Sequence, residues 1–476
     1  MDFLRFNNNT KTVATLGPAC ANKETLLEMA RNGMDVARLN FSHADHETHA
    51  KLLTLIREIN DEYGTNIAIL QDLQGPKIRI GILEEPYAIK PGDIVTLRSD
   101  IKEPGDGCLP IQYQTFAKDV SVGALVLVDD GKVQLRVLET NRANTVKLEV
   151  LEGKTIGSRK GVNLPNTKIS IPTITDKDYI DIDFAVKHNV EWVALSFVRS
   201  ASDVRLLKNL IRLKKGKSRV ISKIEKPEAI SELDEIIKVS DGIMIARGDL
   251  GVEMPLEEVP LLQKEIVRKC NIAAKPVIVA TQMMESMMTS TRPTRAEVSD
   301  VANAVMDGAD AIMLSGETSV GANPAKVVET INRILMLTET HEDIYYRHLE
   351  LTGEERSPLN TAITLTACRL AKETEAKGIV GMTQSGFTAF QIARCRPKAS
   401  IFIFSNNEFV RKQLSVVWGV KSLHYDKFVS TDETIQDVQD ILKEKKLVES
   451  GDVIINTASM PLKARGLTNM VRISQI

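Results

Sequence analysis

Two short segments of the chain bring a lysine and carboxylates close together. Lys223 and Glu225 are separated by one residue, and Asp249 lies in the Arg-Gly-Asp-Leu-Gly run at 247–251. Residues two apart on an extended backbone point the same way, so Lys223 and Glu225 share a face. Two carboxylates can hold one Mg²⁺ and still leave positions for water and substrate oxygens. A lysine beside such a cation can stabilise a phosphoryl group in transfer.

Further polar residues could complete such a site. Arg38, Asn40 and Ser42 alternate along the chain, so an extended strand would point them to one side. Arg38 would add positive charge around a phosphate. Thr281 offers a neutral hydroxyl that could relay a proton, and Gly248 has no side chain to keep backbone N–H groups from an anion. Taken singly, each motif also has a structural interpretation, because a Lys-x-Glu pair is often a solvated ion pair and Arg-Gly-Asp is usually a turn.

The elements that carry these residues repeat one pattern through residues 11–76 and 172–345. A short and mostly apolar run is followed each time by a helical stretch, and the eight runs are 12–16, 35–40, 67–72, 192–197, 220–225, 242–246, 276–281 and 311–315. Such runs are typical of parallel strands buried on both faces. Eight strand–helix alternations predict an α/β fold, a (β/α)₈ barrel, with a doubly wound open sheet as the alternative. Chemistry in such a barrel lies at the carboxyl ends of the strands, where five of these runs end in polar residues.

The alternation is interrupted after the third run, which divides the chain into three domains. We expect the barrel domain to comprise residues 1–76 and 172–345. Residues 77–171 show period-two patterning and a hairpin signal at 129–132, which predict an inserted, small all-β lid domain, a β-barrel. Residues 346–476 return to the α/β pattern, with strand-like runs at 379–383, 401–404, 453–456 and 470–473, and are expected to form a C-terminal regulatory or assembly domain.

Composition excludes several classes of protein. The 476 residues include 61 Lys and Arg against 63 Asp and Glu, so the net charge of -2 gives no sign of a nucleic-acid partner. No run approaches 18 apolar residues, and the first twelve residues have no signal-peptide pattern, so no membrane segment is expected. The five scattered cysteines indicate a reducing, cytoplasmic location. The absence of a Gly-x-x-x-x-Gly-Lys-[Ser/Thr] motif argues against a P-loop nucleotide site.

Several longer motifs, in sequence order, resemble the pyruvate kinase family. They are 37–43 (ARLNFSH), 221–225 (ISKIE), 245–252 (IARGDLGV), 280–284 (ATQMM), 292–304 (RPTRAEVSDVANA) and 313–318 (MLSGET). The resemblance covers the whole chain, including the inserted and C-terminal domains. It implies a cytoplasmic phosphotransferase that moves phosphate from phosphoenolpyruvate to ADP. A Mg²⁺-dependent aldolase or lyase acting on pyruvate enolate, and a non-catalytic protein that kept the fold, are the alternatives.

The resemblance also implies roles for individual residues. Lys223 matches the lysine that stabilises the transferring phosphoryl group, and Arg38 matches the phosphate-binding arginine. Glu225 and Asp249 match the ligands of Mg²⁺, or of Mn²⁺ in its place. The residues that match the family's contacts to the substrate carboxylate are Gly248, Asp249 and Thr281. Thr281 also matches a residue near the carbon that is protonated.

The residues that match the family's contacts to the nucleotide phosphates are Arg79 and Lys160. Lys160 would reach the barrel mouth from the inserted domain. In the family this domain swings over the barrel mouth as a lid. Closure excludes water, which strengthens the electrostatics and prevents hydrolysis of the group in transfer.

One departure from the family concerns the monovalent cation. The residues that match a K⁺ site are Asn40, Ser42, Asp72 and Leu73. Members that need K⁺ carry a Glu where this chain has Lys77, and an ammonium group can supply the same single charge. The resemblance therefore implies that K⁺ is not required. The alternative is that Lys77 points into solvent and that K⁺ still binds.

The C-terminal domain contains Thr-Gln-Ser-Gly-Phe-Thr at 383–388, a plausible phosphate nest. The resemblance implies a possible phosphorylated effector at this loop. Gln384 stands where members that respond to fructose 1,6-bisphosphate tend to carry Lys, which makes that effector doubtful. The loop could equally serve only to cap the helix that follows it. The resemblance also implies a homotetramer.

Overall fold

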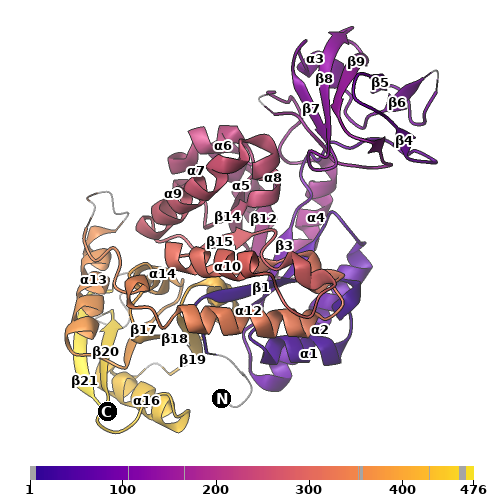
Figure 1. Cartoon of the computed structure of the whole chain (residues 1–476). Coiled ribbons are helices and arrows are strands. Elements are labelled where there is room, and N and C mark those ends of the chain that lie inside the picture. The colour runs from indigo at the N-terminus through magenta and orange to yellow at the C-terminus, as the bar shows by residue number, and fades with distance from the viewer. Residues whose placement is uncertain are drawn as a thin grey trace.

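The first domain is a closed barrel of eight parallel strands (Figure 1). The computed structural model describes residues 7–476 except 106, 166, 352, 354–356, 428 and 460–467. The barrel strands are β1 (Lys11–Thr15), β2 (Val36–Asn40), β3 (Ala68–Asp72), β12 (Trp192–Leu195), β13 (Arg219–Ile224), β14 (Gly242–Ala246), β15 (Val277–Ala280) and β16 (Ala311–Leu314). All eight coincide with the predicted runs to within two residues, so the predicted barrel is confirmed. Nearly every strand residue is buried, as the apolar runs require.

Helices surround the barrel because each buries one apolar face against the strands. They are α1 (Lys23–Arg31), α2 (His46–Tyr63), α4 (Asp176–Lys187), α5 (Ala201–Leu213), α6 (Pro227–Ser231), α7 (Leu233–Val239), α8 (Arg247–Glu253), α9 (Val259–Ile272), α10 (Arg295–Asp307), α11 (Gly316–Ser319) and α12 (Pro324–Thr338). Local signals fix their ends. The side chain of Asp45 accepts the Thr48 N–H at the start of α2, and Gly64 ends α2 in the left-handed conformation.

The inserted domain stands away from the barrel on the side of α4 and α8 (Figure 1). Its elements are β4 (Tyr87–Ala88), β5 (Ile94–Arg98), β6 (Cys108–Pro110), a short helix α3 (Phe116–Asp119), β7 (Leu125–Val128), β8 (Val133–Thr140), β9 (Thr145–Glu152), β10 (Thr155–Ile156) and β11 (Val162–Asn163). Six strands form one sheet in the order β11-β7-β8-β9-β5-β6, and β10 pairs with β4. The turn expected at 129–132 joins β7 to β8, with Asp129, Asp130 and Gly131 at positive φ.

The C-terminal domain is an open five-stranded sheet in the order β19-β18-β17-β20-β21. Its elements are α13 (Pro358–Glu373), β17 (Gly378–Met382), α14 (Phe387–Ala393), β18 (Ser400–Ser405), α15 (Glu408–Gln413), β19 (Val420–His424), α16 (Thr431–Glu444), β20 (Val453–Ala458) and β21 (Met470–Gln475). The four predicted runs are strands. The edge strand β19 escaped prediction, because most of its residues are only half-buried and its apolar signal is weak. Over the residues that the structure describes, no helix has the length and apolarity to cross a membrane.

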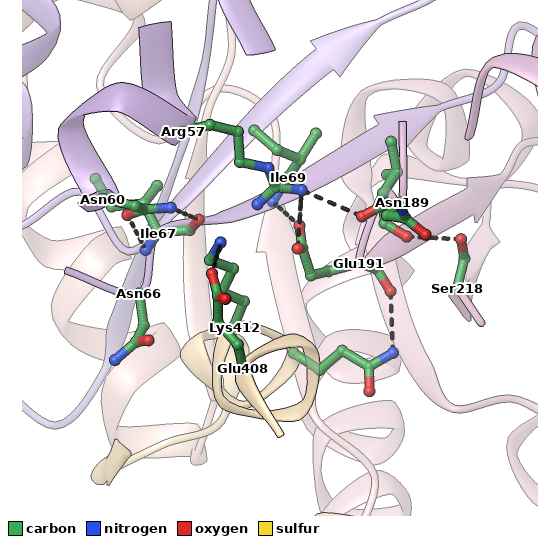
Figure 2. Close-up of polar contacts among 12 residues, drawn as sticks. Arg57, Asn60, Asn66, Ile67, Ile69, Asn189, Glu191, Ser218, Glu408 and Lys412 are labelled. Atoms are coloured by element: carbon green, nitrogen blue, oxygen red, sulfur yellow. Dashed lines mark hydrogen bonds and ion pairs between the residues drawn. The ribbon is translucent and has the colours of Figure 1, made fainter. Parts of the chain in front are cut away.

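Gln413 of α15 joins the C-terminal domain to the base of the barrel, because its Nε2 donates to the Glu191 carbonyl at 3.3 Å and its carbonyl accepts from Trp192 Nε1 at 3.0 Å. Arg57 of α2 reaches Glu191 at 2.9 Å, and a Glu191 oxygen also accepts the N–H of Ile69 in β3 at 2.8 Å (Figure 2). Glu408 and Lys412 of α15 pair beside them. Since these contacts join the amino ends of strands, they lie at the end of the barrel opposite to the mouth.

Candidate active site

The ends of β2 and β3 meet at the barrel mouth through an arginine and a carboxylate. Register pairs Asn40 with Asp72, which places Arg38 within reach of that carboxylate. Arg38 donates from Nε at 2.8 Å and approaches with Nη2 at 2.7 Å, both to Oδ2 of Asp72. Its Nη1 donates to Thr15 Oγ1 at 2.8 Å. Arg38 is only 8% exposed, so its positive charge is held rigidly at the mouth.

Lys223 connects this pair to the next carboxylate around the barrel. Its Nζ lies 2.9 Å from Glu225 Oε1 and 3.3 Å from Asp72 Oδ1, and it donates to Ser196 Oγ at 2.9 Å. Burial acts to lower the pKa of Lys223, but the charges of Asp72 and Glu225 outweigh it and the pKa is raised. The pKa of Asp72 is lowered in turn, because Lys223 and Arg38 overcome the effect of its burial. Both groups are therefore charged at neutral pH.

Glu225 has the properties expected of a metal ligand. Its Oε2 accepts the Phe197 N–H at 2.6 Å. Its Oε1 is buried and has no hydrogen-bond partner, since the contact with Lys223 is an ion pair without hydrogen-bond geometry. Burial raises the pKa of Glu225; Lys223 opposes this rise and the charge of Asp249 adds to it. A divalent cation shared with Asp249 would relieve both effects, so the pair fits Mg²⁺.

The described residues contain no cluster of three or more His, Cys, Asp or Glu side chains that could hold a metal ion. Asp249 stands in the first turn of α8 and is the second carboxylate near Glu225. A site with two protein carboxylates leaves the other coordination positions to water and substrate. Mg²⁺ commonly binds in this way, whereas a metal caged wholly by protein needs more ligands.

Thr281 and Gly248 contact each other where β15 and β14 end. The Gly248 N–H donates to Thr281 Oγ1 at 2.7 Å, and that hydroxyl donates to the Ala280 carbonyl at 2.5 Å. Thr281 has a φ of 71°, a conformation that costs a β-branched residue energy. Arg247 supports it by donating to the Thr281 carbonyl at 2.8 Å while pairing with Asp300 at 2.7 Å. The hydroxyl is thus held at the mouth by the fold.

Two of the residues expected around a monovalent cation, Asn40 and Asp72, lie opposite each other on the neighbouring strands β2 and β3. Asn40 Oδ1 accepts the Ser42 N–H at 3.1 Å, and the Leu73 carbonyl accepts Ser196 Oγ at 2.7 Å. Lys77 lies 3.8 Å from Asp249 Oδ1, so its described ion pair is on the Asp249 side of the mouth.

Lys77 still contributes charge to the same cleft as Arg38. The pKa of His43 is lowered by burial and then by the positive charges of Arg79, Lys77 and Arg38. A group that senses all three charges must lie near them, so Lys77 adds to the positive potential of the mouth.

The two lid-side residues lie on neighbouring backbone segments. Arg79 pairs with Gly161 in an isolated antiparallel bridge, and its Nη1 donates to the Arg159 carbonyl at 3.1 Å. Lys160 forms an ion pair with Asp129 at 2.9 Å. Arg79 lies close enough to the mouth to lower the pKa of His43, and Lys160 directly precedes the residue that bridges to Arg79.

Comparison with known proteins shows to which family the chain belongs. A family model described as the pyruvate kinase barrel domain matches residues 7–328, and one described as the pyruvate kinase alpha/beta domain matches 361–474. The chain belongs to the pyruvate kinase family. Curated pyruvate kinases from Corynebacterium efficiens and Clostridium perfringens are 43% and 41% identical to it, over 98% of this chain and 97% and 99% of theirs. A crystal structure of a pyruvate kinase from Cryptosporidium parvum superposes with a TM-score of 0.91 at 38% identity, covering 98% of this chain and 96% of that one.

Membership of the pyruvate kinase family confirms the predicted fold class and the predicted phosphotransferase activity. The alternative of an enolate aldolase on the same barrel finds no support among these proteins.

Sequence reasoning overlooked two supporting residues at the mouth of this pyruvate kinase fold. Ser196 joins Lys223 to the Leu73 carbonyl, and Thr15 fixes Arg38. Both had a signal, because Ser196 follows the carboxyl end of β12 and Thr15 is the last residue of β1.

Proposed function

We propose that the chain transfers the phosphoryl group of phosphoenolpyruvate to ADP with Lys223 at the centre of the reaction. The observation that carries this proposal is the position of the Lys223 ammonium, within 3.3 Å of both Asp72 and Glu225 and beside a held arginine. The ammonium and the Arg38 guanidinium present fixed positive charge to the equatorial oxygens of a phosphoryl group. Charges that are already oriented need no reorganisation in the transition state.

Glu225 and Asp249 hold Mg²⁺, or Mn²⁺ in its place, in this proposal. The bound cation would supply a Lewis acid for the phosphate and carboxylate oxygens of the substrate. The buried Oε1 of Glu225, which lacks a hydrogen bond, supports this assignment. In the absence of the cation, Lys223 offsets the charge of Glu225 through their 2.9 Å ion pair.

The substrate carboxylate is oriented by Gly248, Asp249 and Thr281. The Gly248 N–H donates to Thr281 Oγ1 at 2.7 Å and the Thr281 hydroxyl donates to the Ala280 carbonyl, so a carboxylate at the mouth would replace these two acceptors. After phosphoryl transfer the enolate carbon takes up a proton beside Thr281. This hydroxyl relays the proton from water and is not its ultimate source, since a threonine hydroxyl does not ionise near neutral pH.

Arg79 and Lys160 bind the phosphates of ADP when the lid closes. The ion pair of Lys160 with Asp129 is half-exposed, so an incoming diphosphate can replace that partner at little cost. Closure over the mouth excludes water and prevents hydrolysis of the group in transfer.

Potassium is not required, because Lys77 supplies the single positive charge. Its ammonium reaches Asp249 and adds to the potential that His43 senses. The sequence predicts this charge near Asn40, Ser42 and Asp72, and the effect of Lys77 on the neighbouring His43 supports that position.

The assembly and its regulation follow the family in this proposal. The enzyme is a cytoplasmic homotetramer, in keeping with five free cysteines in the described residues. Light scattering at micromolar concentration should give about four times the chain mass of 52.7 kDa, and a monomer mass would contradict it. A phosphorylated effector would bind at 383–388, where the Gly386 N–H donates to Thr383 Oγ1 at 2.9 Å and the loop is preshaped.

A coupled assay tests the central proposal. Pyruvate formation from phosphoenolpyruvate should require both ADP and a divalent cation. Release of pyruvate without ADP would point to a phosphatase, and failure to form pyruvate under any of these conditions would refute the function.

A further inference from the structure

A buried polar contact joins the lid to the barrel beside the proposed metal ligands. Glu253, the last residue of α8, accepts through Oε1 from Lys226 Nζ at 2.6 Å and from Asn163 Nδ2 at 2.9 Å. Glu253 is only 4% exposed, Lys226 6% and Asn163 8%. The other oxygen of Glu253, Oε2, has no hydrogen-bond partner among the described residues. One oxygen therefore carries both constraints.

The three residues stand next to the proposed catalytic groups in the chain. Lys226 directly follows Glu225, and Glu253 is one helical turn beyond Asp249 on α8. The ion pair between Lys226 and Glu253 therefore fixes α8 against the segment that carries Glu225. It sets the separation of the two carboxylates proposed to hold the metal.

The third residue belongs to the lid. Asn163 is in β11, which pairs with β7, and it lies three residues beyond Lys160. Next to this contact, lid and barrel are separated by a cavity of about 460 Å³, whose lining includes Leu127 of the lid and Met254 of the barrel. The lid therefore has room to move while the hydrogen bond to Glu253 holds one end of it.

We propose that Glu253 is a positioning residue with two arms. The arm to Lys226 spaces the metal ligands, and the arm to Asn163 places the lid strand near Lys160 over the same site. This inference rests on the proposed roles of Glu225, Asp249 and Lys160. It assigns no contact with substrate to Glu253, which acts only through the groups that it holds.

The two arms can be broken separately. Asn163→Ala removes the lid arm and leaves the ion pair. Lys226→Met combined with Glu253→Gln removes the charged arm but keeps an amide oxygen for Asn163. The double variant avoids an unpaired buried charge, which would otherwise destabilise the fold. Glu257→Gln and Gln134→Ala are matched controls, because the former is exposed just beyond α8 and the latter removes an amide from the same lid sheet.

Each arm has its own expected result. Asn163→Ala should raise the KM for ADP by roughly threefold to tenfold, the effect of losing one hydrogen bond, with Mn²⁺ affinity and the KM for phosphoenolpyruvate unchanged. The double variant should weaken Mn²⁺ binding, measured by paramagnetic relaxation without turnover, by about tenfold. Its KM for ADP at saturating metal should stay near that of the unmodified enzyme. A merely structural role would move all these constants together.

Hydrogen exchange separates this inference from the proposed function. Amides of 160–164 should exchange faster in Asn163→Ala, and those of 225–227 should exchange faster in the double variant. Both results are expected whether or not Glu225, Asp249 and Lys160 bind metal and nucleotide as proposed. If Glu225→Gln leaves Mn²⁺ binding intact, the assignment of Glu225 as a metal ligand fails. Hydrogen exchange would still test the two contacts of Glu253. Exchange equal to that of the controls in both variants, or parallel loss of metal and ADP binding in each, would overturn the inference.

Discussion

The barrel carries buried ionic groups at both of its ends, and the two groups differ in how their charges are balanced. At the base, Arg396 of the C-terminal domain is 2% exposed and pairs with both oxygens of Asp310 at 3.1 and 3.0 Å. It also donates to Asn271 and to the Gly308 carbonyl. At the mouth, Glu225 keeps a buried oxygen without a hydrogen bond beside a second carboxylate.

The difference indicates what each end is for. At the base, one arginine pairs with one aspartate, and this balanced ion pair holds two domains in one arrangement. At the mouth, burial and the charge of Asp249 raise the pKa of Glu225 although Lys223 lies 2.9 Å away, so a divalent cation shared by the two carboxylates would stabilise them. Two neighbouring carboxylates therefore distinguish the mouth from the base, and substitutions at the two ends should have opposite signatures.

The largest effect is expected at the mouth. Lys223→Met should fold but lose roughly 10²–10³-fold or more in kcat, because one preorganised charge disappears from the transition state. Circular dichroism should confirm folding in Mg²⁺, which offsets the charges of Asp72 and Glu225. Lys238→Met, an exposed lysine of α7, is the control and should keep full activity. Turnover close to that of the unmodified enzyme would refute the role of Lys223.

The base should show the reverse. Arg396→Met leaves Asp310 buried without its partner, which should cost about 3 kcal/mol of stability. The thermal midpoint should fall by several degrees, while kcat per folded enzyme stays within about threefold. Arg396→Met combined with Asp310→Asn should recover part of the loss. If kcat of Arg396→Met fell as far as that of Lys223→Met, the proposed difference between the two ends of the barrel would be wrong.

A smaller effect is expected from the metal ligands. Activity should vanish on chelation and return with Mg²⁺ or Mn²⁺. Glu225→Ala and Asp249→Ala should each move the metal titration to concentrations about tenfold to a hundredfold higher. Glu235→Gln on α7, which is exposed, should leave the titration in place. Unchanged titrations in both alanine variants would remove these residues as ligands.

The smallest effect is expected from potassium. In buffer without sodium or potassium, the unmodified enzyme should keep nearly the activity that it has with KCl, at constant ionic strength. Lys77→Glu should be weak alone and recover on adding K⁺, since it exchanges a positive charge for a carboxylate that could help hold a cation. An increase of about tenfold or more with K⁺ over tetramethylammonium in the unmodified enzyme, roughly 1.4 kcal/mol of barrier, would show that Lys77 does not replace the ion.

The sequence by itself determined the elements and the groups that can react. Recurring apolar runs predicted all eight barrel strands, because a parallel strand buried on both faces is mostly apolar. Side chains two residues apart on an extended strand point the same way, which also predicted that Lys223 and Glu225 share a face. Their ion pair follows from this arrangement. These features depend on neighbours in the chain, which is why local pattern reveals them.

Only the tertiary structure decided which distant groups meet. Closure of the barrel brings Asp72 to both Arg38 and Lys223, sets Ser196 between Lys223 and Leu73, and turns Lys77 toward Asp249. It also buries Glu253 between Lys226 and a lid residue that comes 63 positions before that lysine in the chain. The physical reason is that a pKa, a metal site and a buried hydrogen bond depend on burial and on the distance between charges. Both quantities come from the packing of strands and domains, which no local pattern records.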